Sequence, residues 1–330
     1  GSTLLFPNFL SNNLSMEETQ LKTLLEGTYK NSIRKINYNG SGDFHHSFTL
    51  GHSGIHFNAN QFQKLVHSSL KNRVNLISKQ ITNYSQIDAN HIVDCSGKPN
   101  DYTEFNKVTS IPVNSAYIVQ CNWEKPEFNY TLTIARPYGW VFGIPLQNRC
   151  SIGYLYNKNI NTLEEVQEDI KEVFKQFNLN PSNKINSFSF NNYYRKRNHI
   201  NRVTYNGNAS FFLEPLEATS IDCMLTINSN LTEMLGGHIT QDEANIRYQN
   251  FISTSEQMIT MHYFAGSKFK TPFWEYAYNN SLDNINKMTS NPLFRLMFQE
   301  MKEFMNNKGL GKGFPQLQGF GPWGAISFYQ

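Results

Sequence analysis

Cysteine is scarce in this sequence, and its spacing excludes two kinds of stabilising site. Only 4 cysteines occur in 330 residues, and no two of them share a CxxC spacing: Cys95, Cys121, Cys150 and Cys223. Such isolated cysteines argue against a metal site, and they favour free thiols in a reducing compartment over disulfides. We therefore expect a cytoplasmic protein with neither disulfides nor a bound metal.

An excess of charge of one sign and a long apolar run are also lacking. The formal net charge is +3, and the densest basic run is only three residues long, at 195–197. This balance argues against nucleic acid or an anionic membrane as the main partner. No stretch approaches the roughly 20 apolar residues that a membrane span needs, so we expect a soluble chain.

Aromatic residues and asparagine are abundant instead. The chain has 25 Phe, 17 Tyr and 4 Trp, whereas charged residues make up only 17%. It also has 42 Asn against 10 Ala, a bias that weakens helix propensity as a guide to its helices. The composition predicts a globular protein with an aromatic-rich core.

Hydrophobic periodicity predicts strands in the first part of the chain and helices in the last. Strands are predicted over residues 32–38, 44–49, 74–81 and 91–93, and helices over 16–25, 61–70, 164–177, 221–235, 241–264 and 291–305. Between residues 102 and 156, apolar runs separated by Pro and Gly predict an antiparallel sheet. The order indicates an α+β fold.

The segment FFLEPLEATSI, residues 211–221, is the most unusual in the sequence. It places Glu214 and Glu217 on either side of a proline within an apolar run, just before a predicted helix. The first N–H groups of such a helix can hold an anion, and a buried carboxylate beside them is costly, which indicates function more than packing. The alternative is that Glu217 simply caps an ordinary helix.

Three other features are ambiguous when each is taken alone. VDCSG, residues 93–97, ends a predicted strand in small residues that let backbone approach a ligand. Trp140 and Phe142 fit core packing as well as a pocket. Lys30 fits a surface lysine as well as a reactive one.

Taken together, these segments resemble the flavin-dependent halogenases of the tryptophan-halogenase type. The resemblance runs in the family's order over roughly residues 2–275, through STLLFP, TYKNSIRKINY, FHHSF, HFNA, VDCSG, GWVFGIPL with NRCSIGYLY, FLEPLEATSI and MHYFAGSKFKTPFW. It implies a mixed α/β fold with a flavin-monooxygenase-like FAD-binding module and antiparallel substrate sheet over residues 1–223. A mostly helical substrate-side region would follow over residues 224–330.

The resemblance also implies a reaction and its partners. Reduced FAD, dioxygen and a halide would give hypohalous acid, which passes through a tunnel to Lys30 for electrophilic halogenation of an aromatic or indole-like molecule. Glu217 would orient the oxidant or take the ring proton. The implied partners are a small aromatic substrate and a separate flavin reductase, with no nucleic acid or membrane, and an oligomer is left open.

Further positions are assigned by the same resemblance. Thr219 and Ser220 match the halide site, and His46 and Phe48 match the substrate pocket. Trp140 and Phe142 match the tryptophan pair between tunnel and flavin, with Phe142 in place of a tryptophan and Ser220 where glycine is commoner. The expected flavin contacts are Ser96, Gly97, Asn208 and Ile221.

The N-terminal part of this sequence departs from the family. It lacks the strand and GxGxxG turn that cradle a dinucleotide pyrophosphate, and we expect a segment upstream to carry them. Shorter linkers near residues 41–43 and 50–52 predict an open pocket whose substrate need not be tryptophan. Two alternatives stand: a flavin-dependent aromatic hydroxylase, and a non-catalytic binding protein of the same fold.

Overall fold

The computed structural model describes residues 2, 5–48, 53–306, 318–320 and 323–324. Its helices are α1 Leu5–Leu14, α2 Glu18–Leu24, α3 Ala59–Leu70, α4 Leu163–Gln176, α5 Thr219–Leu235, α6 Gln241–Ala265, α7 Pro272–Ser290 and α8 Pro292–Asn306. Its strands are β1 Thr28–Lys30, β2 Ser32–Ile36, β3 Asp43–Ser47, β4 Gly54–His56, β5 Ile92–Asp94, β6 Phe105–Lys107, β7 Ser115–Asn122, β8 Thr131–Arg136, β9 Gly139–Pro145, β10 Arg149–Tyr156, β11 Asn180–Ser189, β12 Tyr193–Arg195, β13 His199–Ile200, β14 Val203–Tyr205, β15 Phe211–Phe212, β16 Gln318–Phe320 and β17 Trp323–Gly324.

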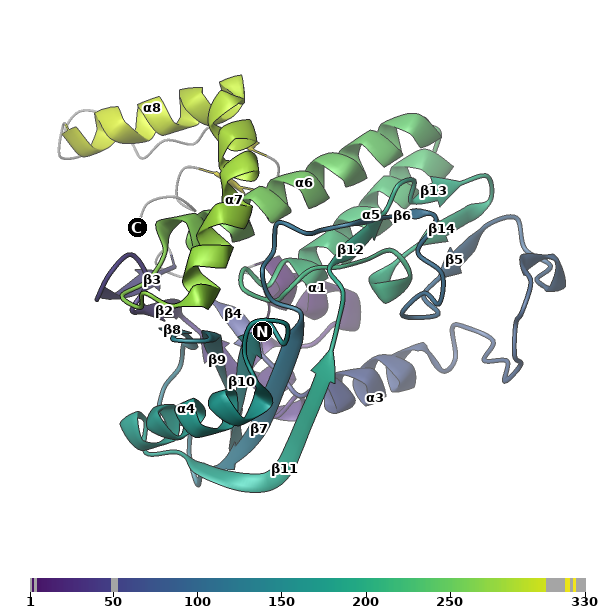
Figure 1. The fold of residues 1–330 in the computed structure, drawn as a ribbon. Coiled ribbons are helices and arrows are strands. Elements are labelled where there is room, and N and C mark those ends of the chain that lie inside the picture. Colours follow the sequence, from purple (N-terminus) through teal and green to yellow (C-terminus); the bar gives the residue numbers. More distant parts are fainter. Residues whose placement is uncertain (1, 3–4, 49–52, 307–317, 321–322, 325–330) are drawn as a thin grey trace.

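A seven-stranded sheet separates two helical layers (Figure 1). Its strand order is β11-β7-β10-β9-β8-β2-β3, with β2 and β8 parallel and the other neighbours antiparallel. Side chains alternate between the faces. Ile134 and Val141 therefore pack with α4, while Ala135 and Trp140 pack with α5, α6 and α7.

Two smaller sheets flank this centre and carry expected site residues. β1 pairs with β4, which places Lys30 opposite Gly54. β5 and β14 run parallel, with Asp94 opposite Tyr205. Because parallel strands end at the same edge, the segments after residues 94 and 205 emerge side by side.

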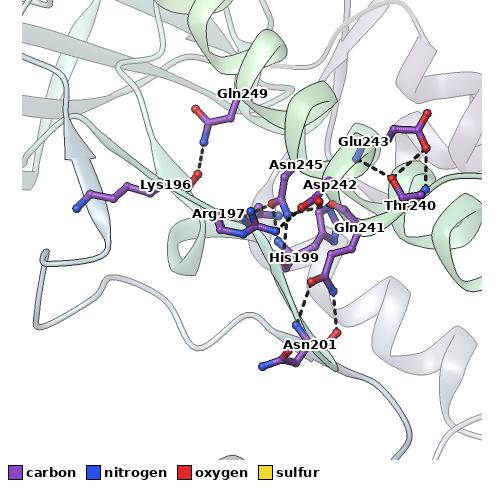
Figure 2. Close-up of polar contacts among 11 residues, drawn as sticks. Lys196, Arg197, His199, Asn201, Thr240, Gln241, Asp242, Glu243, Asn245 and Gln249 are labelled. Atoms are coloured by element: carbon purple, nitrogen blue, oxygen red, sulfur yellow. Dashed lines mark hydrogen bonds and ion pairs between the residues drawn. The ribbon is translucent and has the colours of Figure 1, made fainter.

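The start of α6 is fixed by polar contacts to the β12–β13 segment (Figure 2). Thr240 and Glu243 form a reciprocal capping box. Within the first turns, the Asn245 side chain accepts from the His199 N–H at 3.0 Å and donates to the His199 carbonyl at 2.9 Å. This anchor sets the direction of a helix whose last turns carry His262.

The expected fold class is confirmed, with an antiparallel sheet followed by a mostly helical region. All four cysteines are free, and none of the described helices is long and apolar enough to cross a membrane. The division of the chain at residue 223 stays a prediction.

Several features of the fold differ from the sequence expectations. The strand predicted over residues 74–81 is wrong, because that segment is irregular, pairs with no strand and leaves Ile77 80% exposed. Helices α1 and α7 and strand β11 were not expected. β11 is held by backbone pairing to β7 while most of its side chains are exposed, so it lacks the apolar alternation that marks a strand.

Candidate active site

Lys30 lies at the end of β1 and is buried, with 4% of its surface exposed. Its Nζ lies 3.5 Å from the Ser2 carbonyl oxygen and 5.5 Å from the centre of the Phe48 ring. Burial, aided by the positive charge of Lys35 and opposed by Glu217 and Asp222, lowers the pKa of the amine to about 8. The surface-lysine alternative is therefore excluded.

One cavity brings five of the expected residues together. It has a volume of about 200 Å³, and its walls include Lys30, Trp140, Phe142, Ser220 and Ile221. The Trp140 and Phe142 rings are 6.2 Å apart between their centres. This space is smaller than the roughly 300–1,000 Å³ of typical ligand pockets, so it suits a small inorganic species better than an aromatic substrate.

The first turn of α5 forms one wall of that cavity. Its N-cap is Ala218, which has a left-handed backbone (φ 53°) and makes no side-chain cap bond. The neighbouring Thr219 hydroxyl is buried without a partner among the described residues. First-turn N–H groups lack acceptors within their own helix, so this wall offers donors to an anion. The alternative in which Glu217 merely caps the helix is excluded.

The Glu217 carboxylate lies in a buried cluster, with 9% of its side chain exposed. Its Oε1 accepts hydrogen bonds from Lys35 Nζ at 3.4 Å and from His262 Nε2. Although burial raises its pKa, Lys35 and His262 together hold the pKa of Glu217 well below its usual range. Glu217 is thus an ionised carboxylate whose charge acts on the Lys30 amine.

Lys35 and His262 were not singled out by sequence reasoning. His262 is 45 residues from Glu217, and Lys35 is one of two basic residues in a row on β2. The available signal was the segment MHYFAGSKFKTPFW, which contains His262 and belongs to the resemblance. Residues so far apart in the sequence meet only when α6 packs against the sheet that contains β2.

Glu214 is the second carboxyl group of the FFLEPLEATSI segment, and it is completely buried. It accepts hydrogen bonds from Trp140 Nε1 at 3.1 Å and from the Tyr263 hydroxyl at 2.8 Å. Burial raises its pKa to about 8, more than these two donors lower it. Glu214 is therefore protonated at neutral pH, while Glu217 three residues later is ionised.

His46 and Phe48 lie beside Lys30, as expected of substrate-pocket residues. His46 lies on β3, and its ring centre is 6.3 Å from that of Phe48. The Phe48 N–H donates to the Asn31 carbonyl at 3.2 Å, which holds its ring near the lysine amine. Burial and then Lys35 lower the pKa of His46, so its imidazole is neutral at neutral pH.

The other expected flavin contacts lie farther along α5, where β5 and β14 end. The Ser96 N–H donates to the Asp94 carboxylate at 2.8 Å, and Gly97 has a left-handed backbone with open space where a side chain would point. Asn208 is exposed, and its carbonyl accepts from the Tyr193 hydroxyl at 2.8 Å. A hollow of about 560 Å³ adjoins this edge and includes Asp94 and Ser96.

Both groups of expected flavin contacts border the same helix. After β14, the Asn206 side chain donates to the Met224 carbonyl at 3.2 Å and to Asn228 at 2.9 Å, whereas Ile221 lies in the first turn of α5. Residues 221 and 228 are roughly 10 Å apart along a helix. The unpartnered Thr219 hydroxyl fits a halide, and the open space beside the Gly97 backbone fits the close approach of a flavin.

No group of three or more His, Cys, Asp or Glu side chains among the described residues is arranged to hold a metal ion.

Comparisons with curated proteins find partial relatives. The chain is 25% identical over 150 residues to tryptophan 7-halogenase RebH of Lentzea aerocolonigenes, and likewise 25% identical over 150 residues to tryptophan 6-halogenase ThaL of Streptomyces albogriseolus. Each match covers 44% of this chain and 28% of the relative. The aligned part thus spans less than a third of each relative's length.

Solved structures share the fold at low sequence identity. A tryptophan halogenase from Shewanella frigidimarina superposes with a TM-score of 0.74 at 18% identity, over 99% of this chain and 77% of that one. BrvH, a flavin-dependent halogenase from Brevundimonas sp. BAL3, gives a TM-score of 0.73 at 18% identity, over 88% and 76%. The family model described as tryptophan halogenase matches residues 52–308. The chain belongs to the tryptophan halogenase family.

Proposed function

We propose that this protein is a flavin-dependent halogenase in which Lys30 delivers the halogen to an aromatic or indole-like substrate. The observation that carries the proposal is the buried Lys30 amine in one cavity with Trp140, Phe142 and the first turn of α5. A lysine that is shielded from water and partly uncharged near neutral pH is suited to nucleophilic work. A surface lysine would be charged and inert.

Residues along α5 would hold FAD, with Ser96, Gly97 and Asn208 at one end and Ile221 at the other. When bound, FAD supplies hypohalous acid from dioxygen and a halide, after reduction by a separate flavin reductase. Thr219 and Ser220 would hold the halide, because the N–H groups and the free hydroxyl at this helix start are donors that favour an anion.

Trp140 and Phe142 would line the path between the flavin and Lys30. Their rings and the neighbouring apolar walls offer few polar groups to a passing oxidant, and the small cavity has no room for a bulky substrate beside the flavin. This arrangement would separate formation of the oxidant from its use.

The transfer itself requires an uncharged amine. The Lys30 nitrogen attacks the halogen of hypohalous acid, an N–halogen bond forms, the halogen–oxygen bond breaks, and the hydroxide takes one amine proton to leave as water. The ring carbon of a substrate held by His46 and Phe48 then attacks the halogen, and the N–halogen bond electrons return to Lys30. The ionised Glu217 takes the proton that the ring loses, and that proton then passes to the Lys30 nitrogen, which restores both the uncharged amine and the carboxylate.

A mass-spectrometric screen of aromatic compounds tests this proposal. The intact protein is supplied with FAD, a flavin reductase and chloride, bromide or iodide, and we expect a product heavier by one halogen minus one hydrogen. A hydroxylated product would favour the aromatic hydroxylase. Failure of the intact protein to bind flavin would favour the non-catalytic alternative.

A further inference from the structure

Two buried lysines, not one, lie beside Glu217. Lys30 ends β1 and Lys35 lies on β2, with 4% and 1% of their surfaces exposed. The mechanism above uses only Lys30. A second buried ammonium group is costly and needs a reason, since desolvation penalises each charge separately.

The contacts of the two lysines are different. Lys35 Nζ lies 3.4 Å from Glu217 Oε1 and 3.3 Å from both ring nitrogens of His262. Lys30 Nζ instead faces the Ser2 carbonyl and the Phe48 ring, and among the described residues no carboxylate lies within ion-pair distance of it. The Glu217 carboxylate is thus already paired with Lys35.

We propose that Lys35 is a positioning residue whose ammonium group neutralises Glu217, so that Lys30 is left as an uncharged amine that can accept a halogen. This inference rests on the proposed function of Lys30. The Glu217 carboxylate compensates the buried ammonium with which it forms an ion pair, and that ammonium belongs to Lys35.

The electrostatics of the cluster agree with a charged Lys35 and an uncharged Lys30. Burial lowers the pKa of Lys30 to about 8 and the positive Lys35 acts in the same direction, while Glu217 and Asp222 oppose them. Burial also lowers the pKa of Lys35, but Glu217 counters it by both charge and hydrogen bond. Without Lys35, Lys30 would lose a repelling cation and become the partner of Glu217. The titratable and charged groups that act on Lys30, or on the groups beside it, are Lys35, Glu217, Asp222, His46, His56 and His262.

Lysine NMR tests the proposal without relying on turnover. The intact protein is labelled with ¹³C at the lysine ε-carbon, and the Lys30 signal is assigned by its loss in Lys30→Arg. In Lys35→Met we expect the pKa of Lys30 to rise by at least about one unit, which leaves about tenfold less uncharged amine near neutral pH. Halogenation should then need a correspondingly more alkaline pH.

Three further variants keep the test decisive. Lys35→Arg retains the cation and should leave the pKa of Lys30 near its parent value. Arg34→Met is the matched control, because Arg34 is the adjacent cation on β2 but pairs with Asp43 instead. If Lys35→Met does not fold, the double variant Lys35→Met/Glu217→Gln removes both charges of the pair and should hold the pKa of Lys30 at or below its parent value.

The outcomes separate this inference from the proposed function. An unchanged pKa of Lys30 in Lys35→Met, or a raised one in the double variant, would overturn the role of Lys35 even if product forms normally. A shifted pKa in protein that makes no halogenated product would uphold the division of charge and reject the halogenase function.

Discussion

Trp140 Nε1 donates a hydrogen bond to the Glu214 carboxyl group at 3.1 Å, in a core where that carboxyl has no exposed surface. The bond links an aromatic wall of the Lys30 cavity to the first carboxyl group of FFLEPLEATSI. Three residues later, Glu217 is held ionised by Lys35 and His262. Two neighbouring carboxyl groups whose surroundings shift their pKa values in opposite directions are typical of active sites, where each group then has a different role.

Stability should depend on pH through Glu214. Its pKa is raised from 4.5 to about 8 in the folded protein, so the unfolded chain releases this proton first. The stabilisation is complete below the unfolded pKa and is lost as pH rises through about 8. Urea unfolding of Glu214→Gln should show a smaller fall in unfolding free energy between about pH 5 and about pH 8 than the parent shows. Equal falls in both proteins would mean that Glu214 titrates normally.

The Phe142 ring depends on the glycine opposite it. Gly153 pairs with Phe142 across β9 and β10, and a Cβ at Gly153 would overlap that ring. Gly153→Ala should cost about 1–3 kcal/mol of unfolding free energy by overpacking and should shift Phe142 within the cavity. Adding Phe142→Leu should restore most of that loss in thermal or urea unfolding. A stable single variant with a full-sized cavity would contradict this packing account.

Removal of the Glu217 charge should slow product formation while the oxidant is still made. Glu217→Gln keeps the shape of the side chain but cannot accept the ring proton, so we expect the rate to fall by about 10²–10⁴-fold. Single-turnover product formation gives the rate, with flavin oxidation followed in parallel as a control. A parent-like rate would remove Glu217 from the proton transfer.

The rate of halogenation should rise with pH. The uncharged fraction of Lys30 grows as pH approaches its pKa of about 8, and only that form has a lone pair to attack the halogen. Because Glu214 titrates in the same range, the profile is best recorded in Glu214→Gln as well as in the parent. If the rising limb disappears in Glu214→Gln, it belongs to Glu214 and not to Lys30.

The local hydrophobic pattern of the sequence was enough to predict many of the strands and helices of this fold. Apolar runs separated by Pro and Gly predicted the antiparallel sheet that contains Trp140 and Val141, and the apolar face of residues 164–177 predicted α4. The strand predicted over residues 74–81 was wrong because apolar residues alone do not supply a pairing partner. Strand propensity shows which segments can pair, but tertiary structure decides which do.

The site was predictable only through the family's motifs. Spacing alone left Lys30 as a surface residue and Glu217 as a helix cap, whereas Lys30 is buried and the N-cap of α5 is Ala218. The partners of Glu217 come from β2 and α6, and their meeting depends on long-range packing. Charge clusters built in this way leave no local signal in a sequence.

The most direct test of the central claim follows flavin oxidation and product together in Lys30→Ala. Lys171→Ala is the matched control, because Lys171 is exposed on α4 and pairs only with Glu168 at the surface. With the intact protein, FAD, a reductase, bromide and an indole substrate, Lys30→Ala should continue to oxidise flavin but give no brominated product. Brominated product at the rate of the Lys171→Ala control would contradict the account.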